Sequence, residues 1–317
     1  MSHFLVTGAA GFIGSHLSAE LQSRGHQVRG VDIFTDYYAR HLKQANVHWA
    51  SQHGQFELLE DDLADCDLDP LLDGVDGVFH LAAQPGVRAS WGREFEIYLR
   101  DNVFSSQRLF DAAAQRGLRV IYASSSSIYG DAECYPTTEG LCPRPISPYG
   151  ITKLSCEHLA RSFGDARGLD AVGMRYFTVF GPRQRPDMAF TRLAQAAILG
   201  DTFSLLGDGN QSRDFTFIDD AIDATIGCME AGRSGAIYNI GGGVEITLNQ
   251  AIACLEEVTG NSIDVVRRSR ASGDVRRTAS DCTLIRKDVG WCPRHSLREG
   301  LAEQVDWIRA YHAAAAT

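Results

Sequence analysis

The first forty residues predict a strand, a glycine-rich turn, a helix and a second strand, and this order constrains the fold more than any other feature. The apolar run Phe4-Leu5-Val6 comes first, and glycines at positions 8, 11 and 14 follow before a helical pattern begins. The second strand, Val28 to Val31, ends on Asp32. Glycines in such a turn allow a sharp reversal, let backbone N–H groups approach a phosphate, and let the helix pack on the strand.

The glycine turn and the carboxylate at the end of the second strand together predict a dinucleotide site. The turn alone could be a tight strand-to-helix connection. However, Asp32 lies about 20 residues further on, where the hydroxyls of an adenosine ribose need a carboxylate. The same carboxylate would repel the 2′-phosphate of NADP, so the sequence favours NAD.

Apolar strands and amphipathic helices continue to alternate as far as residue 177. We expect further strands at residues 56–59, 77–83, 120–123 and 171–177. A regular alternation of this kind predicts an α/β fold with a doubly wound parallel sheet.

Beyond residue 178 the pattern changes to Pro- and Arg-rich loops, short strands and three more helices. We therefore predict a dinucleotide-binding domain over residues 1–178 and a smaller C-terminal lobe over residues 179–317. Segments near residues 214–240 are expected to return to the first domain.

Composition and charge exclude several classes of function. The 30 basic and 40 acidic residues give a net charge of −10, which opposes a nucleic-acid or membrane surface as the main partner. No apolar run approaches the roughly 20 residues that span a bilayer, and no signal peptide precedes the first strand, so we expect a cytoplasmic protein. The eight cysteines lack metal-binding spacing, so we expect neither a metal site nor disulfides.

A second stretch predicts where the chemistry takes place. The strand at 120–123 runs into the serines Ser124 to Ser127, and strand ends are where α/β folds place reactive groups. Pro148 is expected to begin a helix. Tyr149 and Lys153, four residues apart, would then share one helix face, and the cation would favour the phenolate form that can accept a proton.

The glycine turn, the serine run and Tyr-x-x-x-Lys occur in this order, and with them the chain resembles the extended short-chain dehydrogenase/reductases over essentially its full length. Within them it is most similar to the nucleotide-sugar 4-epimerases. The resemblance implies a Rossmann fold, a tightly bound NAD that is regenerated in each cycle, and epimerisation of a UDP-sugar through a 4-keto intermediate. It implies that Tyr149 is the general base, that Lys153 holds the nicotinamide ribose, and that Ser125 binds the reacting oxygen.

The resemblance also implies two sets of binding residues. Around the cofactor it places Gly8, Gly11, Phe12, Ile13, Gly14, Asp32, Asp62, Leu63, Leu81, Ala82, Ala83, Asn102, Tyr149, Lys153 and Tyr176. Around the nucleotide sugar it places Arg88, Ser125, Ser126, Ser127, Thr178, Arg185, Arg213 and Asp274, and it makes residues 179–317 the nucleotide-sugar-binding lobe.

The sugar itself is indicated by what stands around the Tyr-x-x-x-Lys motif. Sugar 4,6-dehydratases of the family carry an acidic pair where Ser126 and Ser127 stand, and galactose-type epimerases usually carry Asn where Thr178 stands. The stretch around Thr178 and Arg185 looks like the UDP-glucuronate 4-epimerases, in which these groups hold the sugar carboxylate. We therefore expect UDP-glucuronate and UDP-galacturonate as the substrate pair.

Three alternatives remain open: a 4-epimerase of neutral UDP-hexoses, a UDP-glucuronate decarboxylase, and a non-catalytic NAD-binding sensor. The resemblance further implies a homodimer, because the helices carrying Leu99 to Phe110 and Tyr149 to Phe163 resemble those of the family's four-helix interface.

Overall fold

The structure is a computed structural model that describes residues 1–269 and 275–315. Of the predicted site residues, Asp274 lies outside these ranges.

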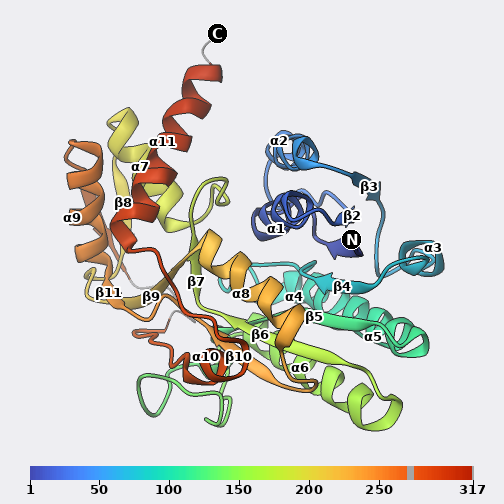
Figure 1. Ribbon diagram of the computed structural model, residues 1–317. Helices are drawn as coiled ribbons and strands as arrows, with labels where there is room; N and C mark the ends of the chain where they lie inside the picture. The colour runs from blue at the N-terminus through green and yellow to red at the C-terminus, as the bar shows by residue number, and fades with distance from the viewer. Residues whose placement is uncertain (270–274, 316–317) are drawn as a thin grey trace.

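A seven-stranded parallel sheet forms the centre of the molecule (Figure 1). Its order is β10-β6-β5-β4-β1-β2-β3, which confirms the predicted doubly wound sheet. In chain order its strands are β1 (His3–Thr7), β2 (Gln27–Asp32), β3 (Phe56–Glu60), β4 (Gly77–His80), β5 (Arg119–Ser125), β6 (Ala171–Tyr176) and β10 (Ile237–Ile240). Strand order reverses between β1 and β4, and the crevice at such a point is where this architecture binds ligands.

Both faces of the sheet are buried, as the continuous apolar runs of its strands require. In β1, Phe4 and Val6 join one hydrophobic cluster while Leu5 joins the other. The first cluster includes side chains of α1 (Phe12–Ser23) and α8 (Ile218–Ala231), and the second includes side chains of α5 (Ser105–Arg116) and α6 (Pro148–Arg167). Figure 1 shows these helices packed on the sheet. The period-two alternation of side chains along the strands produces this arrangement.

The remaining elements of the first half are short or lie at its edge: α2 (Arg40–Ala50), α3 (Asp69–Leu72) and α4 (Phe95–Tyr98). The chain passes from α4 through a π-helical segment, Leu99–Phe104, directly into α5, so the single long helix expected here is interrupted by a wider turn.

The C-terminal lobe contains two small sheets and a group of helices. β7 (Thr178–Phe180), β9 (Ser212–Phe217) and β11 (Glu245–Thr247) form one sheet, and β8 (Phe203–Leu206) pairs with β12 (Val265–Arg268). The helices are α7 (Ala189–Leu199), α9 (Leu248–Thr259), α10 (Thr283–Val289) and α11 (Leu297–Ala315).

The segment near residues 214–240 divides between the two parts of the molecule. β10 lies beside β6 in the large sheet, whereas β9 pairs with β7 and β11 in the small one. A domain boundary at residue 178 stays a prediction. Within the described residues no helix combines the length and the apolar character needed to cross a bilayer.

Candidate active site

A cavity of about 450 Å³ opens at the carboxyl ends of the central strands, on the side where β1 and β4 meet. It collects most of the residues that the sequence predicted for cofactor and substrate. Those that line it are Gly8, Gly11, Phe12, Ile13, Gly14, Asp32, Asp62, Leu63, Leu81, Ala82, Ala83, Ser125, Ser126, Ser127, Tyr149, Lys153, Tyr176, Thr178 and Arg185.

The glycine turn forms one end of this cavity. Gly8 has a φ of +70°, and a Cβ atom there would lie 2.9 Å from the amide nitrogen of Ala82, so only glycine fits without strain. The turn leads into the N-terminus of α1, whose first N–H groups and dipole favour an anion. These features suit the pyrophosphate of a dinucleotide.

Asp32 lies at the end of β2 and is tied to the same turn. Its carboxylate accepts hydrogen bonds from the backbone N–H groups of Ala10 at 3.1 Å and Phe34 at 2.8 Å. Burial raises the pKa of Asp32 against the lowering effect of these two bonds. A carboxylate in this position suits the ribose hydroxyls of an adenosine.

The first turn of α6 presents the tyrosine and the lysine as predicted. The hydroxyl oxygen of Ser147 accepts a hydrogen bond from the Gly150 N–H at 3.1 Å, which caps the helix that begins at Pro148. Nζ of Lys153 lies 6.0 Å from the centroid of the Tyr149 ring. It also donates to the carbonyl oxygen of residue 123 at 2.9 Å, which holds the buried ammonium beside the end of β5.

The serines form a tight turn after β5. The Ser125 hydroxyl accepts a hydrogen bond from the Ser127 N–H and donates to the Ser127 hydroxyl, both at 3.1 Å. Behind it, the Ser124 hydroxyl donates to Glu157 at 2.5 Å, and Glu157 pairs with Arg175 at 2.8 Å. The buried Arg175–Glu157 ion pair therefore holds the serine turn in place through Ser124.

Comparison with known proteins identifies the family to which this arrangement belongs. The model of the NAD dependent epimerase/dehydratase family matches residues 4–241. The chain belongs to this family.

Individual relatives of the chain include epimerases of two substrate types. The crystal structure of UDP-glucuronic acid 4-epimerase from Bacillus cereus in complex with UDP-glucuronic acid and NAD has a TM-score of 0.94 at 38% identity, covering 98% of this chain and 99% of the other. UDP-glucuronate 4-epimerase from Thermodesulfobacterium geofontis is 34% identical over 98% of this chain and 97% of its own. UDP-glucose 4-epimerase from Mycolicibacterium smegmatis is also 34% identical, over 96% and 98%.

These findings confirm the predicted family and fold, and with them an NAD-dependent enzyme of the nucleotide-sugar epimerase type. The relatives named include enzymes for a uronate and for a neutral hexose.

Three predicted residues do not line the cavity of this epimerase-family protein. Asn102 lies behind the wall: its Oδ1 accepts from the Gln84 N–H at 2.7 Å and its Nδ2 donates to the Thr152 hydroxyl at 3.0 Å. It thus supports the Gln84 loop and is absent from the cavity lining, so its contact with the cofactor stays a prediction. Arg88 and Arg213 are also absent from the lining among the described residues, so their contact with the diphosphate stays a prediction.

The segment after β2 adds lining residues that the sequence analysis missed, namely Thr35, Tyr37 and Tyr38 from the loop and Lys43 from the first turn of α2. Lys43 is buried and its Nζ donates to the Thr35 carbonyl at 2.8 Å. One signal could have found it, because Lys43 is one of only three lysines in the chain. No comparable signal marks the two tyrosines.

Proposed function

We propose that the protein interconverts UDP-glucuronate and UDP-galacturonate by NAD-dependent epimerisation at C4. The observation that carries the proposal is the Arg185 guanidinium, which lines the same cavity as Tyr149, Thr178 and the serine turn. A guanidinium can hold a carboxylate through two parallel hydrogen bonds, whereas a neutral hexose has no carboxylate to offer it. The similarity to the Bacillus cereus enzyme supports this choice of sugar.

The residues at the end of β5 and the start of α6 would handle the proton of the sugar. Tyr149 accepts the proton of the 4-hydroxyl, Ser125 hydrogen-bonds to the same oxygen, and Lys153 places a positive charge beside the ring. NAD, held along the glycine turn and Asp32, supplies reversible hydride transfer at C4. After the 4-keto sugar has turned over in the cavity, Tyr149 returns the proton.

The carboxylate contacts also protect the intermediate. A 4-keto uronic acid is a β-keto acid, which loses CO₂ when the breaking C–C bond aligns with the carbonyl π system. Arg185 and Thr178 would hold the carboxylate in the sugar plane, where this alignment is not possible. This constraint distinguishes an epimerase from a decarboxylase built on the same residues.

Proton NMR of purified protein with UDP-glucuronate and with UDP-glucose, each supplied separately, tests the proposal. We expect the C4 epimer from the uronate only. An epimer from UDP-glucose but none from UDP-glucuronate would establish the neutral hexose instead. Release of CO₂ with accumulation of NADH would identify a decarboxylase, and bound NAD without any turnover would identify a sensor.

We also propose that the protein is a homodimer joined by the helical run from α4 to α5 and by α6. Ile97, Leu99 and Phe104 on the first and Ile151 on the second are exposed apolar side chains. Multi-angle light scattering should give twice the chain mass for the native protein, and Leu99→Asp should shift it toward the monomer. A native protein that is monomeric at micromolar concentration would refute the dimer.

A further inference from the structure

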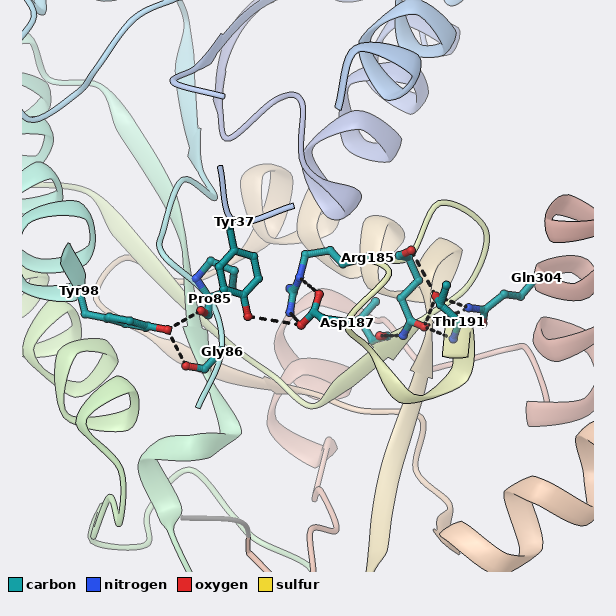
Figure 2. Close-up of polar contacts among 10 residues, drawn as sticks. Tyr37, Pro85, Gly86, Tyr98, Arg185, Asp187, Thr191 and Gln304 are labelled. Atoms are coloured by element: carbon teal, nitrogen blue, oxygen red, sulfur yellow. Dashed lines mark hydrogen bonds and ion pairs between the residues drawn. The ribbon is translucent and has the colours of Figure 1, made fainter. Parts of the chain in front are cut away.

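Arg185 already has a carboxylate partner within the protein (Figure 2). Its Nε donates to Oδ1 of Asp187 and its Nη2 donates to Oδ2, both at 3.0 Å. The two side chains therefore form a two-bond pair of the kind that also binds carboxylate ligands. Burial lowers the pKa of Arg185, but the hydrogen bonds to Asp187, the Asp187 charge and the nearby Tyr37 and Tyr149 together raise it above its ordinary value, so the guanidinium keeps its charge.

The residue before Arg185 anchors the loop on the side of the C-terminal lobe. Gln184 is buried, and its Nε2 donates to the carbonyl oxygen of Val179 at 3.0 Å. Its Oε1 accepts from Nε2 of Gln304 in α11 at 3.0 Å and from the Thr191 N–H in α7 at 3.2 Å. Figure 2 shows this group beside the Arg185–Asp187 pair. The backbone that carries Arg185 is therefore held in place by several elements.

Arg183 anchors the same loop against two helices. Its backbone has a φ of +63°, and its guanidinium carbon lies 4.3 Å from the ring centroid of Trp49 in α2 and 6.0 Å from that of Trp307 in α11. A non-glycine residue in this conformation persists only when its surroundings hold it. The loop thus enters the cavity along a fixed path.

Asp187 is attached in turn to the cofactor side of the cavity. The Tyr37 hydroxyl, in the loop that follows Asp32, donates to Oδ2 of Asp187 at 3.3 Å (Figure 2). Burial and then the Asp187 carboxylate raise the pKa of Tyr37, so the hydroxyl keeps the proton that it donates. Gly86 makes room for this contact, because it has a φ of +99° and a Cβ there would lie 2.4 Å from the Tyr37 oxygen.

A guanidinium offers two edges to carboxylates: the side made by Nε and Nη2, and the end made by Nη1 and Nη2. Asp187 occupies the side. By distance and angle, the hydrogen bonds of Arg185 to the described residues are the two to Asp187, and Tyr37, whose ring centroid lies 5.6 Å from the guanidinium carbon, is another polar neighbour. The end of the guanidinium, with one hydrogen of Nη2 and both of Nη1, is therefore available to a ligand in the cavity.

We propose that Asp187 and Tyr37 are positioning residues that determine selectivity for a carboxylated sugar, by holding Arg185 so that its Nη1–Nη2 end faces the sugar carboxylate. This inference rests on the uronate proposed above. In this arrangement Asp187 binds the Nε–Nη2 side of Arg185, and Tyr37 connects Asp187 to the loop on the cofactor side. Without them the guanidinium would still be present but could rotate away from the ligand.

Calorimetric titration of NAD-loaded protein tests this role. The Tyr149→Phe background stops turnover, and UDP-glucuronate and UDP-glucose are matched ligands that differ by the carboxylate. We expect Asp187→Asn, which keeps the shape but removes the charge, to raise the Kd of UDP-glucuronate about tenfold and to leave that of UDP-glucose unchanged. Tyr37→Phe should raise the uronate Kd two- to threefold, because it removes one neutral hydrogen bond.

Asp170→Asn is the matched control. Asp170 pairs with Arg119 at 2.8 Å, with side-chain exposures of 38% and 22%, against 41% and 20% for Asp187 and Arg185. It lies immediately before β6 and is not among the residues that line the cavity. The control variant should bind both ligands like its parent.

The other outcomes of the titration would contradict either the uronate substrate or the proposed role of Asp187. If the Tyr149→Phe parent protein binds both ligands equally, the proposal that the substrate is a uronate is refuted. The role of Asp187 and Tyr37 in selectivity is then refuted as well. A parent that prefers UDP-glucuronate, combined with an Asp187→Asn variant that weakens both ligands equally, would leave Asp187 a merely structural role. Tighter binding of UDP-glucuronate by that variant would show that Asp187 competes with the sugar instead of orienting Arg185.

Discussion

The two sides of the cavity are built by different means. On the proposed cofactor side the cavity is shaped by the backbone: the Gly8 turn, the N-terminus of α1 and two N–H groups that fix Asp32. On the proposed substrate side the cavity is shaped by side chains, because Arg185 pairs with Asp187, which accepts a hydrogen bond from a tyrosine 150 residues earlier in the chain. The cofactor side therefore tolerates few changes of shape, while the substrate side can change its ligand through single side chains.

This difference fits a family whose relatives act on different sugars. The compared relatives from Thermodesulfobacterium geofontis and Mycolicibacterium smegmatis have equal identity to the chain but carry the names of a uronate and a glucose enzyme. The following variants separate the two sides.

Tyr149→Phe should have the largest effect, because it removes the proton acceptor that serves both sides. We expect kcat for UDP-glucuronate to fall about 10³-fold, within the range for a positioned general base. Bound NAD, measured after denaturation, should stay at the native level. A variant that keeps a tenth of the native rate would assign the base to another residue.

Arg185→Ala should impair the binding and turnover of the sugar without changing the binding of NAD. We expect kcat/KM for UDP-glucuronate to fall roughly 10²-fold, because a charge-assisted, two-bond contact is lost, and CO₂ release to rise per turnover. NAD content should not change. Normal epimerisation of the uronate without CO₂ would exclude Arg185 from carboxylate binding.

Gly8→Ala should weaken the binding of NAD, and Gly25→Ala is its control. Both positions have positive φ, +70° and +83°, but only at Gly8 would the new Cβ meet a neighbour, the backbone nitrogen of Ala82 at 2.9 Å. We expect NAD to bind roughly tenfold more weakly in Gly8→Ala only, while both variants lose about 1 kcal/mol of stability from backbone strain. Equal NAD affinity in the two variants would contradict the close fit of the turn.

His16→Phe should have the smallest effect, and it tests the contact between the two sides. His16 is buried, its ring centroid lies 4.9 Å from that of Trp49, and burial followed by Arg183 lowers its pKa to about 4. Between pH 6.5 and pH 4 the His16 imidazole binds a proton in the unfolded chain but not in the folded chain. The free energy of unfolding therefore falls as the pH falls toward 4.

At pH 5 this histidine should account for about 2 kcal/mol of the lost stability. Urea unfolding of the wild type and His16→Phe at pH 7 and pH 5 measures the difference. If both lose the same stability, another group is responsible for the acid sensitivity.

The cofactor side was predictable from the sequence because its determinants are local. The glycine turn, Asp32 and the α6 motif each depend on residues within about a helical turn or one βαβ unit. The hydrogen bond of Asn102 to Gln84 was not foreseen, since it joins a π-helical segment to a loop 18 residues earlier. The contact of Tyr37 with Asp187 joins segments that only the tertiary fold brings together, so neither residue stood out.

The attachment of the substrate loop to α11 has a consequence for synthesis of the chain. Gln184 and Arg183 depend on Gln304 and Trp307, about 120 residues later. On the ribosome, the glycine turn and the Tyr149 helix can assemble while this loop still lacks its partners. The growing chain should thus acquire its capacity to hold a nucleotide before it can discriminate among sugars.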